Sequence, residues 1–236
     1  MTGRTWNGSE SMLESVDLSA RMGDRQFKNE YKRMGDRLMA LQQKMRALNI
    51  PVVVLLEGWS AAGKGSLISQ LIRSLDPRGF KVYAMETATD EDRRYPAMRR
   101  FWTRMPARGG MSIFDGGWWG EWIETQLKDD VDWNRVRQCR AEIGQMEEQL
   151  LDDGCVLIKL FVHISKKEQR KRFEALEDKK ETRWRVTKAD WAQNERYPAY
   201  QAAYDGMLQD NPDARAPWTL IPGHDRETAE YRMLET

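Results

Sequence analysis

The residues of this chain that are best suited to chemistry lie in the segment 58–66, where four positions separate Gly58 from Gly63-Lys64. An apolar run at 52–57 precedes the segment and a helical pattern at 66–75 follows it, which is typical of a phosphate-binding loop between a strand and a helix. The glycines let backbone N–H groups surround an anion, the helix directs the positive end of its dipole at it, and Lys64 adds a charge. The predicted phosphate-binding residues are Gly58, Ser60, Ala61, Ala62, Gly63, Lys64, Gly65 and Ser66. The alternative is a glycine-rich turn with a chance lysine.

Asp115 is the candidate metal ligand. It ends a short apolar strand pattern at 111–115 and is followed by Gly116-Gly117. The carboxyl ends of parallel strands face the phosphates in phosphate-loop proteins, so an aspartate there is suited to bind the Mg²⁺ of a nucleotide complex. The usual loop has Ser or Thr after its lysine as a further metal ligand, whereas this chain has Gly65. An aspartate before two glycines is also common turn chemistry, which is the alternative interpretation.

Two basic segments are candidates for binding a polyanion. Residues 89–105 are predicted to form one helix that ends before Pro106, and residues 166–176 are predicted to form another. Charge runs are usually solvated helix faces, but in a protein with a phosphate-binding loop a polyanion path is the second interpretation. The candidates for polyanion contact are Arg93, Arg100, Arg104, Lys171 and Arg172.

The pattern of apolar residues predicts the elements that position these side chains. The expected strands cover 52–57, 81–85, 111–115, 156–164 and 216–221, and the remaining expected helices cover 24–48, 132–153 and 192–208. Strands that alternate with helices around a phosphate-binding loop predict a three-layer α/β/α P-loop kinase fold with a mainly parallel, five-stranded sheet. Residues 1–23 are expected to form a flexible N-terminal arm, and residues 24–236 one domain. His163 is expected to be a core or edge residue, and Trp118, Trp119 and Trp122 to belong to a mobile flap or a packed helix.

Composition and charge exclude several classes of protein. The 38 Lys and Arg residues and the 37 Asp and Glu residues leave a net charge of +1 over 236 residues, which does not indicate a DNA- or RNA-binding protein. No apolar segment approaches the length of a membrane span, and the N-terminus lacks the apolar region of a signal peptide. The two cysteines, Cys139 and Cys155, fit reduced thiols better than a disulfide framework, so we expect a cytoplasmic protein.

From about residue 27 onward, the chain resembles the polyphosphate kinase 2 family. The motifs that carry this resemblance are Glu57-Gly-Trp-x-Ala-Ala-Gly-Lys-Gly65, Leu75-Asp-Pro-Arg-Gly79, Arg100-Phe-Trp, Phe114-Asp115 with Trp118, Arg172-Phe173 and Ala216-Pro-Trp218. The resemblance implies Mg²⁺-dependent phosphoryl transfer between inorganic polyphosphate and nucleotides (AMP or ADP, or GMP or GDP), a helical lid at about 116–130 and a homo-oligomer. It implies that Lys64, Asp115 and Arg100 are catalytic, and it accounts for Gly65, because the family's own loop has glycine there.

The chain also departs from the family pattern at charged positions. Ser60 stands at the place of an aspartate in the loop, and uncharged or acidic residues stand at the places of three arginines: Gly116, Glu121 and Leu176. A single arginine in a phosphoryl-transfer site can change the rate by roughly 10³ to 10⁵. Three hypotheses follow. The chain is a polyphosphate:nucleotide phosphotransferase, slow or altered in its substrate; a non-catalytic homologue that binds polyphosphate or nucleotide or pairs with an active subunit; or an ATP-dependent small-molecule kinase.

Overall fold

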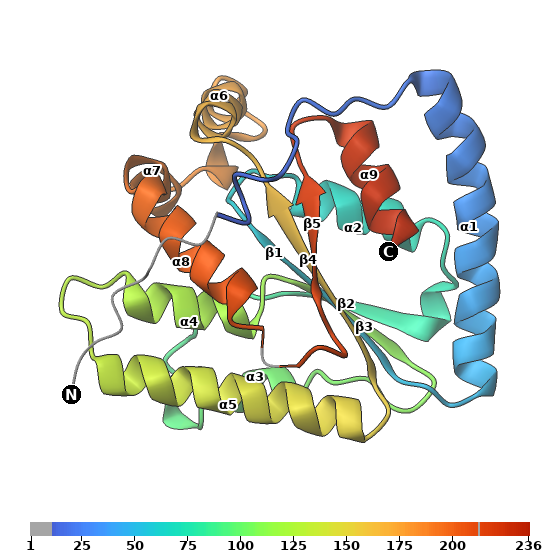
Figure 1. Cartoon of the computed structure of the whole chain (residues 1–236), viewed down its shortest axis with the longest axis horizontal. Helices are drawn as coiled ribbons and strands as arrows, with labels where there is room; N and C mark the ends of the chain where they lie inside the picture. The colour runs from blue at the N-terminus through green and yellow to red at the C-terminus, as the bar shows by residue number, and fades with distance from the viewer. Residues whose placement is uncertain (1–10, 212) are drawn as a thin grey trace.

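A computed structural model of the chain describes residues 11–211 and 213–236. Its centre is a five-stranded sheet in the order β2-β3-β1-β4-β5, in which all four strand pairs are parallel (Figure 1). The strands are β1 (Val52–Gly58), β2 (Phe80–Ala84), β3 (Met111–Asp115), β4 (Val156–His163) and β5 (Trp218–Pro222). The five predicted strands and the parallel sheet are therefore confirmed, with bounds that differ by one or two residues.

Helices cover both faces of this sheet and complete the predicted three layers (Figure 1). The helices are α1 (Asp24–Ala47), α2 (Lys64–Ile72), α3 (Arg99–Trp102), α4 (Trp118–Gln126), α5 (Trp133–Asp152), α6 (Lys166–Glu177), α7 (Lys188–Glu195), α8 (Tyr197–Gln209) and α9 (Arg226–Glu235). Helices α1 and α2 pack against α9, while α5 and α8 pack against α4. Among the described residues, no helix has both the length and the apolar composition needed to cross a membrane.

Two predicted helices are shorter than expected because proline interrupts them. Residues 89–105 form a 3-10 turn (Asp92–Arg94) and the four-residue helix α3, separated by Pro96. Proline lacks a backbone N–H and disfavours helical backbone in the residue before it. In the same way, the expected helix at 192–208 is two helices that meet just before Pro198, and the first begins earlier, at a capping box formed by Thr187 and Asp190.

Part of the predicted N-terminal arm contacts the domain in the structure, while its flexibility stays a prediction. Leu13 is buried, its backbone N–H donates to Asp205 Oδ1 at 3.0 Å, and the Ser11 hydroxyl donates to Asp205 Oδ2 at 2.6 Å. Asp205 lies on α8, so residues 11–13 are attached to the domain. Residues 1–10 of the predicted arm lie outside the described residues.

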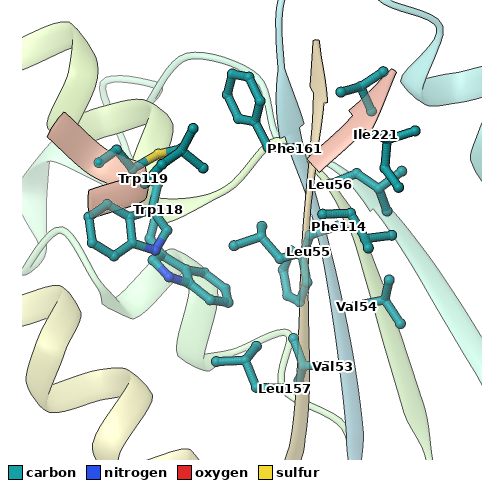
Figure 2. Packing of buried hydrophobic residues seen from close by; sticks show 14 of the residues in the cluster. Val53, Val54, Leu55, Leu56, Phe114, Trp118, Trp119, Leu157, Phe161 and Ile221 are labelled. Carbon is teal, nitrogen blue, oxygen red and sulfur yellow. The ribbon is translucent and has the colours of Figure 1, made fainter. Parts of the chain in front are cut away.

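The core lies between the sheet and the helices, and α4 is anchored in it (Figure 2). Trp118 and Trp119 are fully buried, and both indole N–H groups donate to Glu147 Oε1 of α5, at 2.9 and 2.8 Å. The other oxygen of Glu147 accepts from Lys159 Nζ at 2.8 Å, and neither side chain of this ion pair is exposed. Of the two interpretations of the tryptophan segment, a flap or a packed helix, the structure shows the packed helix. Movement of the predicted lid at 116–130 stays a prediction.

Candidate active site

The predicted phosphate-binding loop lies between β1 and α2, at the carboxyl edge of the sheet. Gly58 has φ +135°, and a Cβ there would lie 2.3 Å from the Val162 carbonyl oxygen, so no larger residue fits without displacing β4. Gly63 has φ +104°, a backbone conformation that side chains disfavour, and precedes the first residue of α2. The strand, loop and helix therefore occur in the order that the sequence pattern predicts.

Lys64 extends back over the loop that precedes it. Its Nζ donates to the carbonyl oxygens of Gly58 at 3.3 Å and Trp59 at 3.1 Å. Glu57, the residue before the last of β1, is buried and accepts the backbone N–H of Gly120 at 3.2 Å. Burial raises the pKa of Glu57 to about 7, against the lowering effect of the nearby Lys64 charge. Glu57 is not among the predicted site residues, although a charged residue near the end of an otherwise apolar strand is a signal that identifies it.

Asp115 lies beside the start of α2. A Cβ built on Gly65 would be 3.8 Å from Asp115 Oδ2, so the carboxylate faces the position at which the usual loop has Ser or Thr. Within the described residues, no group of three or more His, Cys, Asp or Glu side chains gathers to hold a metal. A single carboxylate suits Mg²⁺, which proteins commonly bind through one or two carboxylates and the substrate phosphates, and suits Zn²⁺ poorly.

Ser60, at the centre of the loop, is bound by side chains of α6 and α7. Its hydroxyl donates to Asp190 Oδ1, and its backbone N–H donates to Gln193 Oε1 at 3.0 Å. Its carbonyl oxygen accepts from Gln169 Nε2 at 3.2 Å, and Gln169 also donates to Gln193. The Ser60 N–H that we predicted to contact phosphate therefore has a protein acceptor here. Spacing alone cannot indicate this network, because Ser60 and Asp190 are 130 positions apart.

Arg172 holds the loop from the side of α6. Its Nη1 donates to the carbonyl oxygens of Ala61 and Ala62 at 3.1 and 3.0 Å, and its Nη2 donates to those of Gly223 and His224. Its Nε donates to Glu168 at 2.8 Å. All three nitrogen atoms thus bind protein oxygens, and Arg172 connects the loop to the segment that follows β5. Contact between Arg172 and a polyanion stays a prediction.

The other candidates for polyanion contact differ in exposure. Arg93 is exposed and pairs with Asp90 at 2.7 Å, and Lys171 is exposed and lies 3.7 Å from Glu168. Arg104 donates to the backbone carbonyl oxygen of Arg100. These partners show that the predicted residues do not form one free, exposed row of cations.

Arg100 is the buried member of this set. Its side chain is 8% exposed and pairs with Glu121 Oε1 at 3.1 Å, and its Nη2 donates to the Glu86 carbonyl oxygen. The neighbouring Met85 N–H donates to the Asp115 carbonyl oxygen at 3.0 Å, which connects the Arg100 region to the candidate metal ligand. Glu121, where the resemblance expects an arginine, therefore neutralises Arg100, and a catalytic role of Arg100 stays a prediction.

The model of the family described as polyphosphate kinase 2 matches residues 21–236. The chain belongs to the polyphosphate kinase 2 family. It is 32% identical over 233 residues to a polyphosphate:AMP phosphotransferase of Pseudomonas syringae pv. tomato, covering 98% of this chain and 46% of that protein. It is 30% identical to the Pseudomonas aeruginosa protein of the same name, covering 97% of this chain and 46% of that protein.

A solved structure supports the polyphosphate kinase 2 fold. A Pseudomonas aeruginosa PA01 crystal structure described as a polyphosphate kinase 2 superimposes with a TM-score of 0.89 at 29% identity, over 95% of this chain and 48% of that chain. The chain thus spans about half the length of these two curated relatives and of this structure. The family and the P-loop kinase fold predicted from the sequence are confirmed.

Proposed function

We propose that this chain transfers phosphoryl groups between inorganic polyphosphate and a nucleotide. The observation that carries the proposal is the arrangement of Lys64 on a glycine loop with Asp115 beside Gly65. Three relatives at 30% identity or more are named polyphosphate:AMP phosphotransferase, which favours AMP as the acceptor. ADP, GMP and GDP are the other acceptors to be tested.

The residues of the site supply positioning and charge neutralisation, which is most of what phosphoryl transfer requires from a protein. Backbone N–H groups of the loop and of the first turn of α2 would bind phosphate oxygens, and Lys64 would turn from its carbonyl partners to a phosphate. Asp115 would hold Mg²⁺, which when bound neutralises negative charge on the phosphates. No side chain needs to form a covalent intermediate.

A second candidate function is binding of polyphosphate or nucleotide without turnover. Two observations favour it: the Ser60 N–H is engaged by Gln193, and Arg100 is paired with Glu121. Each removes a group that could otherwise stabilise the transferred phosphoryl group. In this case the chain would act as a binding protein or as the partner of an active subunit.

Location and assembly belong to the same proposal. Cys139 and Cys155 are buried free thiols, which suits the cytoplasm, where thiols stay reduced. We further propose that the protein is a homo-oligomer and does not bind DNA or RNA, in accord with its net charge of +1. Sedimentation velocity tests the assembly, and a single monomeric species would contradict it.

The experiment is a turnover assay with Mg²⁺, long-chain polyphosphate and each of the four nucleotides. Lys64→Ala is the test variant. Lys32→Ala is its matched control, because Lys32 is exposed on α1. We expect polyphosphate-supported turnover that falls on the order of 10² to 10³-fold in Lys64→Ala and is unchanged in Lys32→Ala. Turnover with ATP alone would instead indicate a small-molecule kinase. Binding of polyphosphate without turnover would indicate the second candidate function.

A further inference from the structure

Arg100 is a buried cation with unused hydrogen-bonding capacity. Its side chain is 8% exposed, and its Nε has no hydrogen-bond partner among the described residues. Its Nη2 donates to the Glu86 carbonyl oxygen, and its Nη1 donates to Glu121, the carboxylate with which it forms an ion pair. Asp92 lies close enough for the Arg100 charge to lower its pKa, but no ion pair joins the two among the described residues. A buried guanidinium without an anion is costly, since the loss of solvation is then uncompensated. Arg100 therefore requires an anion at this position.

Glu121 reaches Arg100 from the first turn of α4, close to the loop. The preceding residue, Gly120, donates its N–H to Glu57 at the end of β1. The anchored tryptophans hold the same turn in place. The ion pair thus joins α3 to α4. Gly120, next to Glu121, contacts β1 at Glu57, and Met85, next to the Glu86 that Arg100 contacts, contacts the end of β3 at Asp115. This is the edge of the sheet at which the proposed function places phosphate.

In the Arg100–Glu121 ion pair, the Glu121 carboxylate is the partner that a phosphate oxygen can replace. The Glu121 side chain is 26% exposed, whereas Arg100 is the deeper partner. Burial raises the pKa of the Glu121 carboxyl, and the Arg100 charge opposes that effect. A phosphate oxygen can make the same charge-assisted hydrogen bond to a guanidinium as a carboxylate oxygen, and can also accept from Nε.

We propose that Glu121 occupies the anion-binding position of Arg100 and thereby limits the negative charge that this site accepts. A phosphate group of the polyphosphate or nucleotide reaches Arg100 only when the Glu121 carboxylate leaves. This inference rests on the proposed function in one respect, namely that the site binds phosphate. Glu121 is then a residue that determines specificity, because it disfavours ligands with more charge.

The experiment is calorimetric binding of linear polyphosphate of defined length to the whole chain. The variants are Glu121→Gln, which removes the charge, and Glu121→Asp, which keeps the charge and shortens the side chain by one methylene. Glu148→Gln is the matched control, because Glu148 is exposed on α5 and its replacement changes the net charge equally. We expect Glu121→Gln to tighten binding about ten-fold, the equivalent of one charge-assisted hydrogen bond.

Three results would overturn the inference: unchanged or weaker binding in Glu121→Gln, the same gain in Glu148→Gln, or no binding by any variant. If Glu121→Gln does not fold, Glu121→Asp replaces it, with a smaller gain expected because its carboxylate stops short of Arg100 Nη1. Turnover is recorded separately. Tighter binding by Glu121→Gln without turnover in any variant would refute the proposed phosphotransferase function and support the role of Glu121. Turnover without tighter binding would support the proposed function and refute the role of Glu121.

Discussion

Replacement of Ser60 by aspartate tests whether the Asp190 carboxylate lies against the phosphate-binding loop. In the structure, the Ser60 hydroxyl donates to Asp190 Oδ1, while Asp190 Oδ2 accepts the N–H and hydroxyl of Thr187, each at 2.7 Å. Asp190 is therefore held as an acceptor and cannot turn away without breaking the cap of α7. Ser60→Asp would place a second carboxylate against it.

The cost follows from the repulsion between two charges. At about 4 Å and an effective dielectric constant of about 20, it is about 4 kcal/mol. Both residues are half-buried, and screening by solvent reduces this to about 2 kcal/mol. For a chain of this size, we expect the melting temperature to fall by about 4 to 8 °C. A divalent cation between the carboxylates would reverse the loss, since a ligand at 100 times its Kd stabilises by about 2.7 kcal/mol.

The assay is thermal unfolding in EDTA and in excess Mg²⁺. Ser60→Asn is the matched control, because its amide can donate to Asp190 and adds no charge. We expect Ser60→Asp to melt below Ser60→Asn in EDTA and to recover most of the difference with Mg²⁺. Equal melting temperatures of the two variants in EDTA would refute the reasoning. Unequal temperatures without recovery would show repulsion but no metal site.

Two further predictions concern buried polar groups. Glu147→Gln would leave Lys159 charged and without its anion. We expect the free energy of unfolding, measured with urea, to fall by about 3 to 5 kcal/mol. A fall below about 1 kcal/mol would contradict the ion pair that the structure shows. Burial lowers the pKa of His163 to about 4, from about 6.5 when unfolded, so its contribution to stability is complete above pH 6.5 and is lost as the pH falls toward 4. As the pH falls through this range, the free energy of unfolding of His163→Gln should therefore decrease by about 3 kcal/mol less than that of the parent chain. Parallel curves of unfolding free energy against pH would argue against a lowered pKa of His163.

The local patterns of the sequence predicted the backbone of the site. A β-branched run, two glycines and a lysine indicated the loop, since strand, turn and helix depend on neighbouring residues. Asp115 came beside the loop because parallel strands bring their carboxyl ends to one edge. The proline breaks at Pro96 and Pro198 were visible in the sequence, and α9 was missed because its pattern after the last strand is weak.

The partners of the charged side chains were decided only by the tertiary structure. Arg100 and Glu121 are 21 positions apart, Trp118 and Glu147 are 29 apart, and no spacing rule connects them. The sequence predicts that Arg100 contacts a polyanion, whereas in the structure Arg100 pairs with the Glu121 carboxylate. The sequence by itself determined the fold and the phosphate-binding loop, because these follow from short-range backbone preferences and from the hydrophobic pattern. The structure decided which charges remain available, because an ion pair depends on where distant segments meet.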